Sequence, residues 1–415
     1  MRVLIAPDCF TGTLSAPQAA AAVADGWRRQ APGDELELLP LSDGGPGFVD
    51  VLHAALGGEL LPVTVPGPLG EPAPAVILLT RGAGGEEGGD GPDGPDGTEG
   101  PVTRTAYVES AQACGSHLVP GDRCGGRWGG DEHRDPGRAT TAGVGRLLAE
   151  ARGAGATRIV VGLGGSGTND AGAGALLAAA DAAGVELPAR LRDLLGHGGA
   201  GLHGATAADL APLTDVRAAW ADTTIVVATD VDAPLLGPHG ASLGFAPQKG
   251  ASADQAKDLE SALMGFAGSA IAATGVPQRM VATPGAGAAG GLGFGLMLLG
   301  GLRSAGIDAV ADAVRLRERI AATDLVVTGE GKLDWQSLQG KVVAGVAALG
   351  LEAGVPVIAV AGQVEVGRRE LLNLGIESAY PLARTPEQVR LALADPAGTL
   401  TDRAARVART WTRPG

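Results

Sequence analysis

Residues 158–176, RIVVGLGGSGTNDAGAGAL, change character twice over a short distance: an apolar run ends in glycines and small hydroxyl residues, which give way to an alanine-rich segment. This order is typical of a strand, a tight loop and a helix. Residues 159–161 suit a buried strand, and Asn169 and Asp170 are favoured caps for the following helix. Such a loop exposes backbone N–H groups to an anion. The stretch predicts either a phosphate or carboxylate cradle or a connection without a ligand, and alone it does not decide between them.

The same glycines also fit G-x-G-x-x-G, the dinucleotide fingerprint, which requires an acidic residue about twenty positions later. Asp181 comes too early and lies in an alanine-rich helical stretch, and no strand ending in an acid follows at the expected distance. The sequence contains no Walker A pattern either. We therefore do not expect a nicotinamide cofactor, and any nucleotide must be bound by another kind of loop.

Composition limits the classes of function. A chain of 415 residues with 45% hydrophobic content is long enough for two domains, and its net charge of −14 argues against nucleic acid or an anionic membrane as partner. Cys9, Cys114 and Cys124 lack metal-ligand spacing, which favours a reducing compartment. The sequence opens on a strand rather than an export signal, and its longest uncharged stretch, 283–302, is crowded with glycine. We expect a soluble, cytoplasmic protein.

Lysine is scarce, since it occurs only at positions 249, 257, 332 and 341, and asparagine occurs only at 169 and 373. In a chain whose net charge is negative, an anionic substrate must be met by individually placed cations. Lys249, Lys332 and Lys341 lie in glycine-flanked stretches, and Asn169 lies in the central loop. We favour a functional role for these residues over a chance placement.

Strand and helix patterns alternate at both ends of the chain. The pattern predicts strands at 3–6 and 36–41 with helices from about Ala16 and over 48–56, and it returns in DLVVTGEGKLD and VPVIAVAG near the C-terminus. The predicted fold class is therefore α/β, with a doubly wound parallel sheet in a discontinuous domain of residues 1–60 and 285–415. A second α/β domain, residues 61–284, is inserted and carries the glycine-rich loop.

Polar residues follow the ends of several predicted strands. Asp8 and Asp43 come just after the first two, and Glu330, Lys332 and Asp334 follow a third. Because ligands bind beyond the carboxyl ends of strands in open α/β sheets, we expect these side chains to face one cleft. For either aspartate taken alone, a turn or cap role is the more common one.

Two more acids, Asp230 and Asp232, follow the apolar strand in TIVVATDVDAPL, and Lys249 lies between a glutamine and a glycine. Acids close to a phosphate loop can hold Mg²⁺, which proteins commonly bind through one or two carboxylates together with substrate phosphates. A capping or salt-bridge role explains Asp232 equally well.

Seven motifs together resemble, in order and over nearly the whole chain, the bacterial glycerate kinase family of the glycerate 2-kinase class. They are APDCFTGTLSA, LSDGGPG, GLGGSGTNDAGAG, ATDVDAPLLGPHGAS, FAPQKGA, GAGAAGGLGFG and TGEGKLDWQSLQGK. The resemblance implies a flavodoxin-like domain, an inserted second domain and ATP-dependent phosphorylation of D-glycerate. It also implies 2-phosphoglycerate rather than 3-phosphoglycerate as the product.

The chain departs from the family pattern in its loops. Cys9 and Thr11 stand for the serine and lysine of D-S-F-K-G, and Pro46 and Phe48 stand for the glutamate and threonine of A-D-G-G-E-G-T. Ala233 replaces the asparagine of D-V-x-N-P, and Lys332 replaces an arginine. Two of these changes lie at neighbouring strand ends and remove polar groups, so we hypothesise a remodelled acceptor pocket. A kinase for another small hydroxy acid and a non-catalytic binding protein remain the rival interpretations.

Phosphoryl transfer requires in-line positioning, cations on the phosphate oxygens and a group that accepts the hydroxyl proton. Residue chemistry and motif position assign the candidates as follows: Gly164, Gly165, Ser166, Thr168 and Asn169 bind the nucleotide phosphates; Lys249 offsets developing charge; Asp230 is the Mg²⁺ ligand; Asp170 is the general base; and Asp8, Asp43, Glu330, Lys332 and Asp334 line the glycerate side. An exchange of roles between Asp170 and Asp230 stays open. We expect ATP and Mg²⁺ as cofactors, D-glycerate as substrate, no nucleic-acid or membrane partner, and a possible homo-oligomer.

Overall fold

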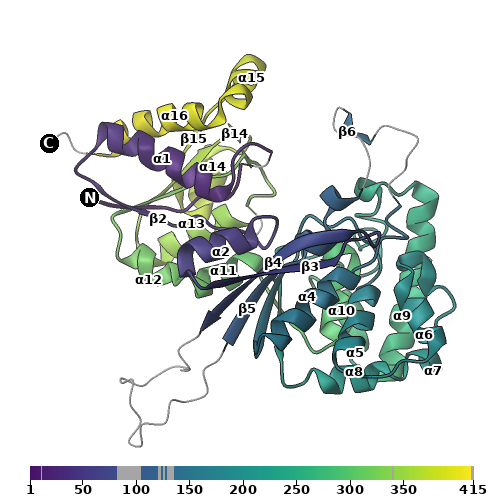
Figure 1. Cartoon of the computed structure of the whole chain (residues 1–415). Coiled ribbons are helices and arrows are strands. Elements are labelled where there is room, and N and C mark those ends of the chain that lie inside the picture. The colour runs from purple at the N-terminus through teal and green to yellow at the C-terminus, as the bar shows by residue number, and fades with distance from the viewer. Residues whose placement is uncertain are drawn as a thin grey trace, which may run out of the picture. The chain divides into compact units, whose positions relative to one another are not determined.

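The structure is a computed structural model that describes residues 1–10, 12–81, 104–119, 123–124, 127–128, 135–338 and 341–412. The chain divides into two compact units. Unit 1 comprises Met1–Asp43, Asp50–Gly57 and Ala305–Gly415, and unit 2 comprises Gly44–Val49 and Gly58–Ser304. Unit 1 is therefore built from both ends of the chain, as Figure 1 shows by the purple and yellow helices that lie together.

Unit 1 contains a five-stranded sheet in the order β15-β13-β11-β1-β2, in which every pair is parallel. Its strands are β1 (Arg2–Ile5), β2 (Glu35–Leu38), β11 (Leu325–Thr328), β13 (Val357–Ala361) and β15 (Ile376–Pro381). When the five strands are numbered by their order along the chain, they lie side by side as 2-1-3-4-5, which is the strand order of flavodoxin-like doubly wound sheets. That order reverses between β1 and β11, so the loops that follow these two strands flank the position where such sheets bind ligands.

The helices of unit 1 cover this sheet. They are α1 (Ala16–Gln30), α2 (Phe48–Leu56, which begins in unit 2), α11 (Gly306–Ala313), α12 (Leu316–Ala321), α13 (Val342–Ala353), α14 (Arg368–Leu374), α15 (Pro386–Ala394) and α16 (Pro396–Trp411); a small pair, β12 (Lys332–Leu333) and β14 (Gln363–Val364), completes the unit.

Helix α1 illustrates how local sequence and packing agree. It begins at a capping box, in which Ser15 and Gln18 each accept the other's backbone N–H. It packs against α16, and a Cβ atom at Gly26 would lie 2.1 Å from the carbonyl oxygen of Thr401. The absence of a side chain at Gly26 thus lets the two helix backbones touch and close one face of the unit.

Unit 2 contains a six-stranded mixed sheet in the order β10-β9-β8-β5-β4-β3. Strands β5 (Arg104–Glu109), β8 (Arg158–Gly162), β9 (Thr224–Ala228) and β10 (Leu302–Ser304) run parallel, whereas β3 (Glu59–Pro66) and β4 (Pro72–Arg81) form an antiparallel edge. Residues 159–161 of β8 are buried, as their apolar run predicts. The predicted sequence of strand, loop and helix at 158–176 is thus confirmed.

The remaining elements of unit 2 are mainly helical. They are α3 (Ala111–Cys114), α4 (Ala142–Gly153), α5 (Ala173–Ala182), α6 (Ala189–Gly196), α7 (Ala207–Leu210), α8 (Leu213–Ala219), α9 (Ala253–Thr274) and α10 (Ala288–Leu298), the short helices η1 (Ser116–Leu118), η2 (Gly199–Leu202), η3 (Pro247–Lys249) and η4 (Gln278–Ala282), and the pair β6 (Arg123–Cys124) and β7 (Arg127–Trp128).

Helix α10 corrects the expected domain boundary. Its residues Leu292 and Phe294 are fully buried in the core of unit 2, and a Cβ atom at Gly295 would lie 2.7 Å from the Cα atom of Gly172. This close contact of backbones places the segment 285–304 in unit 2. The second part of unit 1 begins at residue 305, not at 285, because α10 belongs to the other core.

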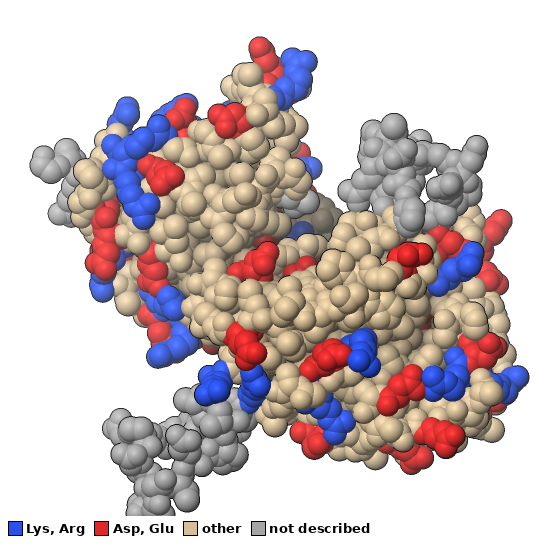
Figure 2. All heavy atoms as spheres, viewed as in Figure 1, with Lys and Arg blue, Asp and Glu red and all other residues tan. Residues whose placement is uncertain are grey.

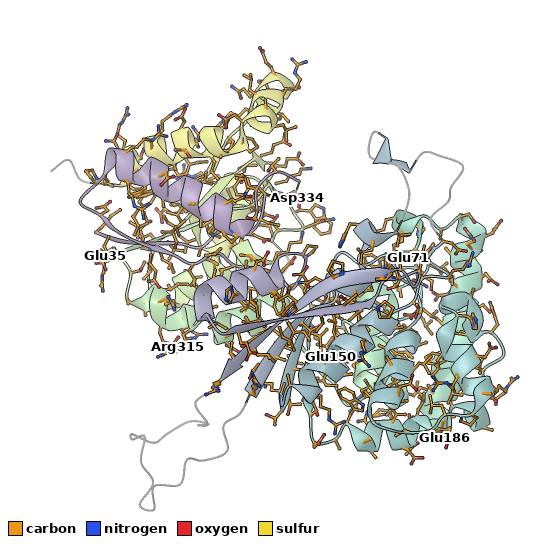
Figure 3. The ribbon with its side chains drawn as sticks, viewed as in Figure 1. Glu35, Glu71, Glu150, Glu186, Arg315 and Asp334 are labelled. Carbon is orange, nitrogen blue, oxygen red and sulfur yellow. The ribbon has the colours of Figure 1, made fainter. Side chains whose placement is uncertain are left out.

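Charged side chains of both signs alternate on the visible surface of each unit (Figure 2). Glu150 on α4, Glu186 beyond α5 and Arg315 between α11 and α12 are labelled examples in Figure 3. Glu150 pairs with Arg146 one helical turn earlier, at 2.8 Å. No helix within the described ranges combines the length and the apolar character needed to cross a membrane.

Candidate active site

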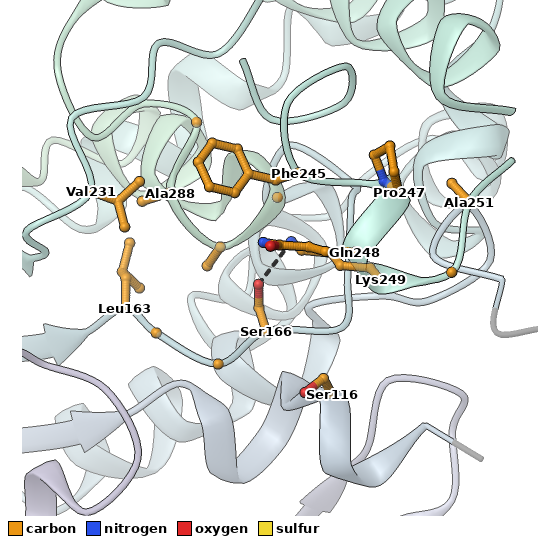
Figure 4. Close-up of a pocket in the computed structure, with 16 residues that line it drawn as sticks. Ser116, Leu163, Ser166, Val231, Phe245, Pro247, Gln248, Lys249, Ala251 and Ala288 are labelled. Atoms are coloured by element: carbon orange, nitrogen blue, oxygen red, sulfur yellow. Dashed lines mark hydrogen bonds between the residues drawn. The ribbon is translucent and has the colours of Figure 1, made fainter. Parts of the chain in front are cut away.

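A cavity of about 950 Å³ opens in unit 2 beside the glycine-rich loop. Five segments line it: Ser116 of η1, Leu163–Ser166 after β8, Val231 after β9, Phe245 with residues 247–251 around η3, and residues 287–290 at the start of α10. Figure 4 shows that one wall is apolar, where Phe245 lies near Val231 and Ala288, while Lys249 and Ser166 meet inside the cavity. The cavity thus joins an apolar wall to a polar, cationic floor.

The glycine-rich loop packs closely against residues 44–46 of the same unit. A Cβ atom at Gly164 would lie 2.6 Å from the Cα atom of Gly45, and Gly165 has a φ of +63°. Any larger residue at Gly164 would push the two backbones apart. Glycine is therefore required here by close packing, and both Gly164 and Gly165 line the cavity.

Glu109, which no sequence motif singled out, fixes the supporting segment. Its side chain is buried at the carboxyl end of β5, and Oε2 accepts hydrogen bonds from the backbone N–H groups of Gly47 at 3.0 Å and Val49 at 3.4 Å. A carboxylate at this place receives the first free N–H groups of α2, as in a helix cap. An acid directly after an apolar strand was the available signal, the same one that marked Asp8.

Lys249 is a buried cation at the floor of the cavity, with 6% of its surface exposed. Its Nζ donates to the Ser166 hydroxyl at 2.9 Å and to the Thr168 carbonyl oxygen at 2.8 Å, and Figure 4 draws the first of these bonds. Burial lowers the pKa of the Lys249 ammonium from 10.5 to about 8, and the negative charge of Asp170 opposes this effect. The amine is consequently positioned to donate to an anion in the cavity.

Thr168 and Asn169 lie deeper than Ser166, because both are fully buried. Asn169 Nδ2 donates to the Ser242 hydroxyl at 3.0 Å, and the Thr168 side chain lies near the thiol of Cys114. Burial raises the pKa of that thiol to about 12, which makes it unreactive. Thr168 therefore contributes its carbonyl group to Lys249, and Asn169 fixes the loop against Ser242.

Asp170 is also fully buried, and the structure surrounds it with donors. Its two oxygens accept from the N–H and the hydroxyl of Thr141, both at 2.8 Å, and from the N–H groups of Gly172 at 3.0 Å and Gly174 at 3.2 Å. Burial raises the pKa of Asp170, while these four bonds lower it. The residue thus caps the start of α5, as the sequence indicated, and its hydrogen bonds leave it poorly suited to the expected role of general base.

Asp230 and Asp232 diverge after β9. Asp232 pairs with Arg303 at 2.6 Å and is largely exposed, so the salt-bridge alternative describes it. Asp230 directly precedes Val231, which lines the cavity. Within the described ranges, no group of three or more His, Cys, Asp or Glu side chains could hold a metal ion. A Mg²⁺ ion here would need the mixed coordination by one or two carboxylates and substrate phosphates that the sequence predicted.

In unit 1, the charges of Asp43 and Glu330 act on Asp8. Burial, followed by the charge of Asp43, raises the pKa of Asp8 to about 7, and the backbone N–H of Cys9 donates to its Oδ1 at 2.6 Å. Burial likewise raises the pKa of Glu330. These three acids form an electrostatically coupled group, which we call the acid cluster.

Lys332 and Asp334 have other partners. Lys332 is half exposed and pairs with Glu365 at 2.9 Å, whereas its Nζ is 3.9 Å from Asp334. Asp334, labelled in Figure 3, accepts from the N–H of Gln336 at 2.9 Å and so stabilises a turn. Of the five residues expected on the glycerate side, Asp43 and Glu330 act on the charge of Asp8, and Asp334 acts on that of Glu330, whereas Lys332 pairs with Glu365.

The loop departures fall in different places. Cys9 adjoins Asp8 in unit 1, whereas Pro46 and Phe48 belong to unit 2. Phe48 is fully buried and meets Tyr107 edge-on, with ring centroids 6.2 Å apart. The departure from the family pattern at position 48 therefore concerns core packing and not an acceptor pocket shared with Cys9. Ala233 is buried, and its carbonyl oxygen accepts from Gly287. Thr11 lies outside the described residues.

Comparison with known proteins gives a consistent result. The model of the glycerate kinase family matches residues 3–412. A glycerate kinase of Bacillus subtilis is 38% identical over 92% of this chain and 90% of its own length. A glycerate 2-kinase of Escherichia coli is 38% identical, with the same coverage. A crystal structure provisionally assigned as glycerate kinase 2 from Salmonella typhimurium LT2 has a TM-score of 0.73 and 33% identity, and the match covers 99% of this chain and 98% of that one.

Proposed function

The chain belongs to the glycerate kinase family, and from this premise we propose that it transfers the γ-phosphoryl group of ATP to a hydroxyl group of D-glycerate. We further propose 2-phosphoglycerate as the product, in keeping with the name of the E. coli relative. The observation that carries the proposal is Lys249, a buried ammonium group held by Ser166 and Thr168 in a cavity of about 950 Å³.

The cavity suits a nucleotide in both size and chemistry. Ligand sites of this kind join an apolar wall to a few placed polar groups. We assign the base to the wall formed by Phe245, Val231 and Ala288, and the phosphates to the floor. There the backbone of Gly164 and Gly165, the Ser166 hydroxyl and the Lys249 ammonium supply the donors that phosphate oxygens require.

Charge is the physical requirement of the reaction. The transferred group carries negative charge on its equatorial oxygens, so catalysis depends on positioning and on nearby cations. Lys249 supplies one such cation, because its Nζ retains a third proton after donating two hydrogen bonds. Asp230 is the proposed protein ligand of Mg²⁺, which would neutralise phosphate charge when bound with the nucleotide.

The acceptor side is proposed to lie with the acid cluster of unit 1. Its loops follow strand ends at the switch point of the sheet, where open α/β folds bind small ligands. Cys9, which stands where the family pattern has serine, adjoins Asp8. This departure supports a second candidate function, the phosphorylation of another small hydroxy acid.

The test is ADP release from Mg-ATP with D-glycerate and with a panel of related hydroxy acids, followed by NMR identification of the product. Turnover of D-glycerate to 2-phosphoglycerate would support the proposal, and turnover of another acid alone would favour the second candidate. Turnover to 3-phosphoglycerate would refute the regiochemistry only. Nucleotide binding without turnover of any acid would refute the activity.

A further inference from the structure

A nucleophile and a base meet on the floor of the cavity in unit 2. The Ser166 hydroxyl and the Lys249 Nζ atom are 2.9 Å apart, and Figure 4 draws the bond between them. Both residues line the cavity, where Ser166 is partly exposed and Lys249 is buried. An amine within hydrogen-bond distance of a serine hydroxyl is the arrangement that activates serine in enzymes with a serine–lysine pair. The pair therefore has the geometry for nucleophilic chemistry as well as for phosphate binding.

The loop holds Ser166 in place from both sides. The carbonyl oxygen of Gly165 accepts a hydrogen bond from the N–H of Ser116 at 2.8 Å. The N–H of Gly167 donates to the carbonyl oxygen of Cys114, also at 2.8 Å. Because the backbone on either side of Ser166 is fixed, its hydroxyl loses little freedom when it approaches a bound group, which favours reaction.

Lys249 is oriented by a third group, because its Nζ atom also donates to the carbonyl oxygen of Thr168 at 2.8 Å. The neutral amine can keep this bond, since it has two N–H groups and gains a lone pair. With one N–H directed at Thr168, the lone pair can accept the proton of the Ser166 hydroxyl. A nucleophile, a base and an orienting group thus lie in sequence, which is the general pattern around an activated serine.

The surroundings of Lys249 make its amine form accessible. Burial lowers the pKa of Lys249 to about 8, against the negative charge of Asp170. Cys114, the other titratable group that acts on Lys249, keeps its proton, because burial raises the pKa of its thiol to about 12. About one tenth of the molecules therefore carry the amine at pH 7, and about half at pH 8. The ammonium form leaves the serine proton free to bind phosphate, whereas the amine form takes it up.

We propose that Ser166 is a self-phosphorylation site, which takes the γ-phosphoryl group of bound ATP when no acceptor acid is present, with Lys249 as the base. This inference rests on the proposed function, which assigns the triphosphate to this cavity. As Ser166 Oγ forms its bond to the γ-phosphorus, its O–H bond breaks and the proton passes to the lone pair of Lys249 Nζ. The bond from the γ-phosphorus to the bridging oxygen breaks, and its electron pair stays on ADP. The products are ADP and a phosphoserine that the new ammonium group stabilises by charge.

The experiment incubates the full-length wild type with saturating Mg-ATP in the absence of any hydroxy acid. Intact-protein mass spectrometry measures the rate at which one phosphoryl group is gained, and peptide mapping locates it. We expect phosphoserine at position 166. Between pH 6 and pH 8 the rate should rise about 50-fold for a base with a pKa of about 8, and up to about 100-fold where the bound phosphates raise that pKa.

Three variants separate the roles of the two side chains. Ser166→Ala removes the nucleophile and should abolish the modification. Lys249→Arg keeps a cation for the phosphates, but its guanidinium group stays protonated and cannot act as a base. The modification should therefore fall by about 10²-fold or more, while calorimetry still detects nucleotide binding. The matched control is Ser261→Ala, a change of an exposed serine on α9, which should be modified at the wild-type rate.

A wild type that phosphorylates D-glycerate but gains no phosphoserine at position 166 would overturn this inference and leave the proposed function intact. A rate that stays constant between pH 6 and pH 8, or a Lys249→Arg protein that is modified at the wild-type rate, would overturn the role of Lys249 as the base. Modification of Ser166 without turnover of any hydroxy acid would support the inference and overturn the proposed function. A wild type that does not bind nucleotide would overturn both.

Discussion

Replacing Lys249 with methionine separates the contribution of this residue to stability from its contribution to catalysis. Moving the pKa of the amine from 10.5 to about 8 corresponds to a cost of about 3 kcal/mol for keeping the ammonium in the folded state. Because the folded pKa is the lower one, the unfolded chain binds more protons between about pH 8 and 10.5. The cost is thus fully present below pH 8 and disappears as the pH rises through 10.5.

Lys249→Met removes this cost with a side chain of similar length. The Thr168 carbonyl oxygen loses its donor from Lys249 Nζ, and a buried acceptor left unpaired costs about 1–3 kcal/mol. The sum predicts a free energy of unfolding that is unchanged or up to about 2 kcal/mol higher. Turnover should fall by about 10²–10³-fold, the usual effect of removing one group that stabilises charge in the transition state.

Thermal unfolding and ADP release at pH 7 test both halves of this prediction. The matched control is Lys257→Met, because Lys257 is largely exposed on α9 and pairs with the exposed Asp254 one turn away; its effect on stability should stay within about 0.5 kcal/mol, with activity unchanged. A Lys249→Met protein that keeps its turnover within about tenfold, or whose unfolding free energy drops by more than about 2 kcal/mol, would refute the reasoning.

Three further predictions concern unit 2. Asp170→Asn turns an amide group toward donors from Thr141, Gly172 and Gly174 and should destabilise the protein by about 3–5 kcal/mol in urea unfolding; a stable but inactive variant would instead restore Asp170 as a base. Glu109→Ala leaves the N–H groups at the start of α2 unpaired and should cost about 1–3 kcal/mol by the same measurement; no loss would contradict the anchoring role. Gly164→Ala should abolish nucleotide binding in calorimetry, because its Cβ would meet Gly45, whereas Gly153→Ala, with open space around it, should bind normally.

Much of the fold follows from periodicity alone. The helix predicted over 48–56 is α2 (Phe48–Leu56), and the strands predicted at 3–6 and 36–41 are β1 and β2, with ends displaced by a few residues. These elements obey local rules: an uninterrupted apolar run forms the buried strand β1, and a capping box starts α1 at Ser15. The boundary at 285 was wrong because glycines of α10 pack against a segment more than a hundred residues earlier, and no local pattern reveals that contact.

The residues of the candidate site, too, were predictable from the sequence only in part. Ser166 and Lys249 were proposed from motif position, and the structure brings them within 2.9 Å of each other. Asp170 shows the limit of such reasoning, because its closest donor, Thr141, lies 29 residues away in the sequence. A carboxylate that caps a helix and one that accepts a proton look alike in a motif; only the number of donors around it tells them apart.

The construction of unit 1 from both chain ends has a consequence for synthesis on the ribosome. Strand β1 needs β11 as its neighbour, and the hydroxyl of Thr328 reaches the carbonyl oxygen of Ala6 across 322 residues. Domains generally fold as units while the chain emerges, so the nearly continuous unit 2 can fold first while the first forty residues wait without their sheet. A nascent chain that stops before β11 would hold a finished unit 2 and an unpaired β1 edge, exposed to proteases and to other strands.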